Sequence, residues 1–82
     1  MGKIPRGISG RELAHLLSKY GYSIVRQTSS HIRLASRFKD TEHNITIPDH
    51  QPLKIGTLNN ILKDISEYLK IPKEELIKNL FQ

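Results

Sequence analysis

The feature that most constrains the fold is an alternation of apolar and polar side chains over residues 30–35. In an extended strand, successive side chains point to opposite faces of the sheet, so Ile32 and Leu34 share one face. By the same rule, His31 and Arg33 share the other face. If the aliphatic face packs against helices, the imidazole and the guanidinium must face solvent.

Two further strands are predicted on either side of this one. Residues 22–27 have the composition of a strand, with Ile24 and Val25 at its centre. Residues 43–47 alternate isoleucines with polar residues, and Pro48 ends this strand because proline cannot donate to a strand ladder. The three strands follow one another through short turns, which predicts an antiparallel sheet.

Helix signals lie before and after the strands. Ser9 and Glu12 match a capping box, and Gly21 ends the helix that they begin. A second helix starts near Gly56, and a short third helix follows Pro72. The side chains expected to face the core are Leu13, Leu16, Leu17 and Tyr20, then Leu58, Ile61, Leu62, Ile65 and Leu69, then Leu76, Ile77, Leu80 and Phe81. We predict an α+β fold with helices on one face of a three-stranded antiparallel sheet and the other face open.

Composition sets limits on size, compartment and partner. The chain has 82 residues, which predicts a single domain over residues 1–82 with a small core. It has no cysteine, so disulfides and thiolate metal sites are excluded. With no apolar run near the roughly 20 residues of a membrane span and no signal-peptide region, we expect a cytoplasmic protein. The net charge of +5 favours a nucleic acid or an acidic protein as partner, although a merely solvated basic surface also fits.

His31 is the residue best placed for chemistry. It starts a strand on the solvent face, directly after a turn that carries hydroxyl groups and close to arginines. RNA brings its own nucleophile, the 2′-hydroxyl, and an imidazole can take or give the protons that cleavage moves near neutral pH. An ordinary surface histidine is the alternative interpretation.

The residues around His31 suggest how a polyanion would be held. Arg26, Arg33 and Lys54 are candidates for binding phosphate or stabilising the transition state, with simple solubility as the alternative for each. Ser29 and Ser30 can hold the imidazole or a phosphate oxygen, or can serve only to form the turn.

Metal catalysis and small-molecule cofactors are not expected. His43, His50, Asp40, Glu42 and Asp49 are close in the sequence, but none has the His-Glu-x-x-His spacing. A zinc pattern of cysteines and histidines is absent, as is a glycine-rich phosphate loop. We therefore predict no metal site.

Several short segments, taken in their order along the chain, resemble one known family. They are Ile8-Ser9-Gly10 with Leu16-Leu17, Gly21-Tyr22, Val25-Arg26-Gln27, Ser30-His31, Ile47-Pro48 with His50, Leu53-Lys54, Gly56-Thr57-Leu58 and Ile61-Leu62. This combination resembles the HicA toxin family, the small ribonuclease half of HicAB toxin–antitoxin modules. Ser30-His31 resembles the end of the family's Gly-Ser-His signature.

The resemblance implies more than the pattern of residues does. It implies a fold like the double-stranded RNA-binding domain, cleavage of messenger RNA, and neutralisation by a HicB-like antitoxin. It also implies that His31 is the catalytic histidine, acting without a metal. His50 matches a position that is often histidine in the family. The resemblance leaves two roles open for it, a second proton donor or an anchor for the loop before the second helix. Ser29 stands where the family usually has glycine, so the turn is expected to differ in shape.

Two other functions remain open from the sequence. The first is a non-catalytic RNA-binding module of the same fold, in which replacement of His31 would leave RNA binding unchanged. The second is an interaction protein whose open face binds only a partner protein, with no affinity for RNA at low salt.

Overall fold

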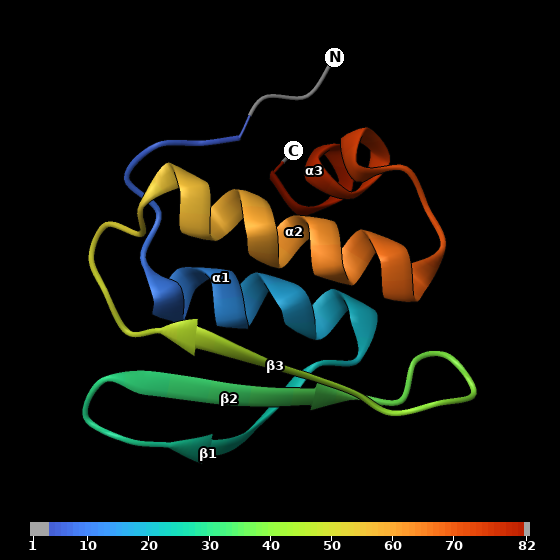
Figure 1. The fold of residues 1–82 in the computed structure, drawn as a ribbon, viewed down its shortest axis with the longest axis horizontal. Coiled ribbons are helices and arrows are strands. Elements are labelled where there is room, and N and C mark those ends of the chain that lie inside the picture. Colours follow the sequence, from blue (N-terminus) through green and yellow to red (C-terminus); the bar gives the residue numbers. More distant parts are fainter. Residues whose placement is uncertain (1–3, 82) are drawn as a thin grey trace.

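The fold consists of a sheet and a layer of helices in the predicted order. A computed structural model describes residues 4–81 (Figure 1). The elements are α1 (Gly10–Leu16), the 3-10 helix η1 (Leu17–Tyr20), β1 (Ser23–Gln27), β2 (His31–Ser36), β3 (His43–Pro48), α2 (Ile55–Leu69) and α3 (Lys73–Phe81). The predicted α+β class and element order are confirmed. Among the described residues, no helix is both long and apolar enough to cross a membrane.

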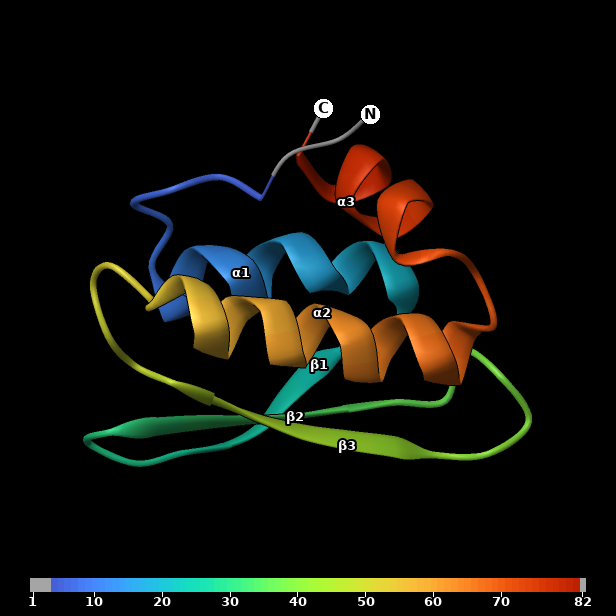
Figure 2. The same cartoon turned by 45° about the horizontal axis from the view of Figure 1, so that its top comes forward.

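The sheet has the strand order β1-β2-β3, and both pairs are antiparallel. Helices α1 and α2 lie side by side over one face of this sheet, and α3 lies beyond them (Figures 1 and 2). No described element covers the opposite face. This is the layout of a double-stranded RNA-binding domain, with β2 as the central strand.

The ends of the first helix follow the predicted local rules. The Ser9 hydroxyl accepts a hydrogen bond from the Glu12 amide at 3.0 Å, and the Glu12 carboxylate accepts one from the Ser9 amide at 3.0 Å. Gly21 takes a left-handed conformation, with φ of +79°, directly after η1. These contacts fix where α1 begins and where the chain turns into the sheet.

The core lies between the sheet and the two central helices. Ile32 and Leu34 of β2 and Ile45 and Ile47 of β3 are buried, as the alternation predicts. All five predicted stripe residues of α2 are buried as well, and so are three of the four in α3. The exceptions among the predicted core residues are Leu16, Tyr20 and Phe81, which are only partly buried.

The helix changes type after Leu16. From Leu17 to Tyr20 it is a 3-10 helix, which advances each residue by about 120° rather than about 100°. The α-helical spacing used to predict the stripe therefore does not hold at Tyr20. Ala14, on α1, is buried in addition to the predicted leucines.

The first strand departs most from a regular pattern. Ile24 pairs with Leu34 and Arg26 pairs with Arg33, so Val25 is an extra residue that forms a bulge between them. Because of the bulge, Arg26 shares the open face with Arg33. Ile24 and Val25 are 53% and 56% exposed, although both lie at the centre of the strand.

A network of polar and aromatic side chains ties β3 to the second helix. His43 contacts the hydroxyl of Tyr22 through Nδ1 at 2.6 Å and the carboxylate of Asp64 through Nε2 at 3.2 Å. Its ring stacks on Tyr68, with ring centroids 4.6 Å apart. Burial, with smaller contributions from Tyr68 and Asp64, raises the pKa of the Tyr22 hydroxyl above its ordinary value. His43 thus contacts Tyr22, Asp64 and Tyr68 at once, so we assign this network a structural role.

We predict opposite effects of alanine at two glycines. A Cβ atom on Gly10 would overlap the carbonyl oxygen of Pro48, so Gly10→Ala should lower the free energy of unfolding by roughly 1–3 kcal/mol. A Cβ on Gly56 meets nothing within 4 Å, so Gly56→Ala should raise it by roughly 0.4–1 kcal/mol. Urea unfolding of both variants and of the wild type measures these changes in the free energy of unfolding. Equal stability of the Gly10 variant and the wild type would show that α1 packs less closely on β3 than this overlap requires.

Candidate functional site

A groove of about 520 Å³ lies on the open face of the sheet, around the start of β2. Its lining residues are Val25, Arg26, Thr28, His31, Arg33 and Thr46. They come from all three strands and from the turn between β1 and β2. The lining contains two arginines and a histidine but no carboxylate, so the groove suits an anion.

The turn that presents His31 is built around the hydroxyl of Thr28. This hydroxyl accepts hydrogen bonds from the backbone amides of His31 at 3.1 Å and of Ser30 at 3.4 Å. The Thr28 amide also donates to the His31 carbonyl at 2.9 Å, which closes the turn. The backbone on both sides of the imidazole is therefore fixed before any ligand binds.

The imidazole itself is held on one side only. Ser30 Oγ lies 3.0 Å from His31 Nδ1, a hydrogen bond between neighbours in the sequence. Nε2 has no hydrogen-bond partner among the residues that the structure describes. The ring is exposed to solvent, so Nε2 is accessible to a substrate in the groove.

The two arginines of the groove face each other across β1 and β2. Arg26 and Arg33 are direct cross-strand partners, and both are exposed. Like charges placed directly opposite each other in a sheet are destabilising, by roughly 0.2–1 kcal/mol. A bound phosphate between them would replace this repulsion with two charge-assisted hydrogen bonds. The pair therefore does not stabilise the sheet, and it concentrates positive charge in the groove.

Some of the predicted residues lie outside the groove. Lys54 is the N-cap residue of α2, in the helical layer, and does not line the groove. His50 is exposed in the loop after β3, where its backbone carbonyl accepts a hydrogen bond from Gly10 at 3.0 Å. The loop is thus tied down through the backbone of His50.

Ser29 stands where the family usually has glycine, but its backbone does not take a conformation that favours glycine. Among the described residues other than glycine, only Lys70 has a positive φ. The turn before His31 is therefore formed without strain at Ser29. Ser29 is exposed, and the groove is lined by its neighbour Thr28 instead.

Thr28 and Thr46 also line the groove, although neither was predicted from the sequence as a site residue. Thr28 immediately precedes the two serines, and a hydroxyl at the start of a turn is a known signal for this kind of capping. Thr46 reaches the groove because it pairs with Arg33 across β2 and β3. Within residues 4–81, no three His, Cys, Asp or Glu side chains come together in a way that could hold a metal ion.

Comparisons with known proteins identify the family. A family model described as the HicA toxin of bacterial toxin–antitoxin systems matches residues 10–66. No match was found among curated proteins or among solved structures. The matched segment runs from the first residue of α1 into α2 and contains every residue that lines the groove. It covers well over half of the sequence, so this chain belongs to the HicA toxin family.

Proposed function

We propose that this toxin is an endoribonuclease that cleaves messenger RNA, with His31 as its catalytic acid–base residue. The main support for this proposal is one observation. An accessible imidazole and two arginines line the same groove, and no carboxylate lines it. The imidazole supplies proton transfer, and the arginines supply positive charge at the phosphate.

The proposed reaction uses the nucleophile that RNA already contains. His31 Nε2 removes the proton from a ribose 2′-hydroxyl, and the 2′-oxygen attacks the adjacent phosphorus. The bond from phosphorus to the 5′-oxygen breaks, which leaves a 2′,3′-cyclic phosphate on one product and a 5′-hydroxyl on the other. Water supplies the proton for the leaving 5′-oxygen, since the groove lies on an open face of the sheet.

The other groups of the site have positioning and charge roles in this proposal. The hydrogen bond between Ser30 and Nδ1 orients the ring so that Nε2 faces the ribose. Arg26 and Arg33 bind the non-bridging phosphate oxygens, whose negative charge increases in the transition state. Nucleophile, proton acceptor and charge are all supplied by RNA and these side chains, so the proposed reaction requires no metal ion and no cofactor.

The proposal extends to where the toxin acts and how it is neutralised. Messenger RNA as the substrate places the toxin in the cytoplasm. Membership in a toxin–antitoxin family implies an antitoxin partner in general. We propose that this partner is a HicB-like protein that covers the groove around His31. Such a cover would block the phosphate from the two arginines and the imidazole at once.

The direct test is cleavage of a single-stranded RNA in excess chelator by three proteins. The wild type and His15→Ala should cleave equally, because His15 is an exposed histidine outside the groove. His31→Ala should lose at least about 100-fold in rate, the usual contribution of a general acid–base group. His31 is exposed, so its replacement should leave the thermal unfolding temperature unchanged.

Three other outcomes would change the proposed mechanism or function. Cleavage that disappears with chelator in the wild type would require a metal. Equal cleavage by the wild type and His31→Ala would exclude His31 as the catalytic group. RNA binding by both proteins without cleavage by either would favour the non-catalytic RNA-binding module.

The arginine pair gives a second prediction, in which stability and binding change in opposite directions. Arg26→Gln removes the repulsion with Arg33, so the free energy of unfolding should rise by roughly 0.2–1 kcal/mol. RNA affinity should fall, and the slope of log affinity against log salt should decrease by about one, because one phosphate contact is lost.

These measurements are best made in a His31→Ala background, which prevents cleavage during titration. Lys78→Gln is the matched control, because Lys78 is an exposed cation on α3, away from the sheet. It should change neither the stability nor the salt slope. An Arg26→Gln variant that binds RNA with unchanged affinity and salt slope would rule out a phosphate contact at this arginine.

A further inference from the structure

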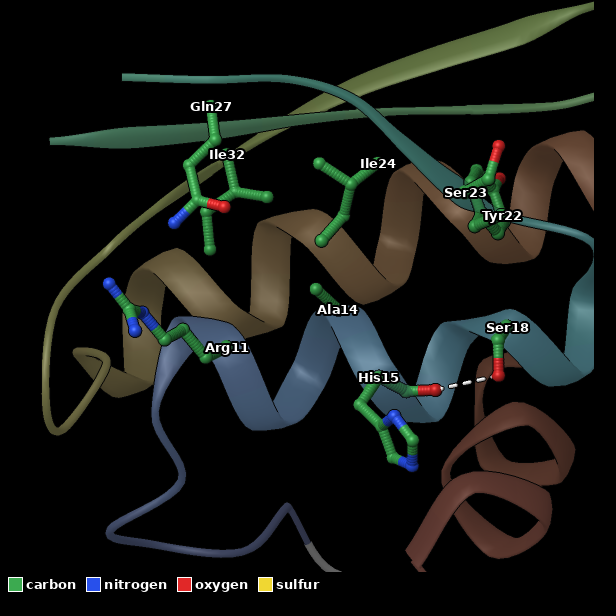
Figure 3. Close-up of a pocket in the computed structure, with 9 residues that line it drawn as sticks. All are labelled: Arg11, Ala14, His15, Ser18, Tyr22, Ser23, Ile24, Gln27 and Ile32. Carbon is green, nitrogen blue, oxygen red and sulfur yellow. Dashed lines mark hydrogen bonds between the residues drawn. The ribbon is translucent and has the colours of Figure 1, made fainter. Parts of the chain in front are cut away.

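Another concave surface of the molecule lies on the other side of β1, between this strand and α1. It is a groove of about 510 Å³, with Ala14, Tyr22, Ile24 and Ile32 as its apolar part. Figure 3 shows Ile24 pointing from β1 toward Ala14 on α1. Ile24 lies on the same face of the sheet as the fully buried Leu34, yet α1 leaves it 53% exposed. A large apolar side chain on the core side of a sheet is thus left without cover.

The strand that borders this groove also has a free edge. β1 is the outer strand of the sheet, so the backbone groups on its far side have no partner strand among the described residues. Such an edge can pair with an added strand, and backbone hydrogen bonds then combine with side chains seated in the adjacent groove. The bulge at Val25 interrupts this edge but leaves Val25 exposed to an added strand.

Charge indicates what kind of segment can bind there. The groove is lined by Arg11 and by no aspartate or glutamate. Arg11 contacts Asp49 through Nε and Nη2, at 3.2–3.3 Å, but is 71% exposed, and its Nη1 has no partner among the described residues. Arg26 projects from the other face of the same strand. An added strand would meet an arginine on each face, and Arg26 has no carboxylate partner among the described residues, so these charges favour an acidic strand.

We propose that the edge of β1 and the groove beside α1 bind an extended, acidic segment of a partner protein as a fourth strand of the sheet. Apolar side chains of that segment contact Ile24, and its carboxylates pair with Arg11 and Arg26. A second copy of this chain does not fit, since it would bring the same arginines and a net charge of +5 to the contact. The inference rests on the proposed toxin function, in which the partner is the antitoxin, and it gives that partner a second contact besides the groove around His31.

The test uses the full chain, labelled for NMR, and two synthetic octapeptides at millimolar concentration. One peptide repeats Val-Val-Glu-Glu, which places valine and glutamate on both faces of an extended strand, and the other has lysine in place of each glutamate. The glutamate peptide should shift the backbone amides of residues 23–27 and slow their hydrogen exchange at least tenfold. The lysine peptide should bind at least tenfold more weakly. Protection of the amides distinguishes strand addition from loose contact with the side chains.

Two variants locate the contact. Ile24→Thr keeps a β-branched residue in the strand but removes apolar surface from the groove, so it should weaken the glutamate peptide about tenfold. Phe38→Ala is the matched control, because Phe38 is equally exposed and lies outside this groove. It should leave peptide binding unchanged.

The outcome is separable from the proposed RNA cleavage. Ile24→Thr should cleave RNA at the wild-type rate, and His31→Ala should bind the peptide with wild-type affinity. The inference is overturned if the glutamate peptide fails to protect residues 23–27, or if both peptides bind equally. It is also overturned if these amides become protected as the protein concentration rises without peptide, which would indicate a second copy, or if a short RNA protects them instead.

Discussion

The alternation of side chains along β2 is the constraint on which both the fold and the site depend. Ile32 and Leu34 are buried against the helical layer, so their neighbours His31 and Arg33 are directed to the open face. A slip of one residue in the pairing would exchange these two sets and place charged groups in the core. The same packing that holds the sheet on α1 and α2 therefore positions the imidazole and the arginine on the open face.

Regular features of the fold could be predicted because they depend on local physical rules. The capping box of Ser9, the left-handed Gly21 and the stripe of α2 follow from spacing alone, and the structure confirms them. The placement of His31 and Arg33 on one open face was also predictable, since it needs only the period of a strand. The role of these residues in catalysis stays a prediction.

The irregular features could not be read from the sequence. A bulge at Val25 has no periodic signal, yet it decides that Arg26 faces Arg33 and that Ile24 lies beside α1. A hydroxyl before the turn indicates that Thr28 can cap it, but the contact with the His31 amide in particular depends on the shape of the turn. Lys54 was expected among the phosphate-binding residues because it is basic, but its position as the N-cap of α2 was set by the helical layer.

The most direct test of the central claim is the chemistry of the RNA ends. We would cleave an oligonucleotide with the wild-type protein, then repeat the reaction with a single 2′-deoxy nucleotide at the cleaved position. The proposed mechanism predicts a 2′,3′-cyclic phosphate on the first substrate and no cleavage of the second at that position. Cleavage that continues without the 2′-hydroxyl, or products that carry 5′-phosphate and 3′-hydroxyl ends, would contradict it.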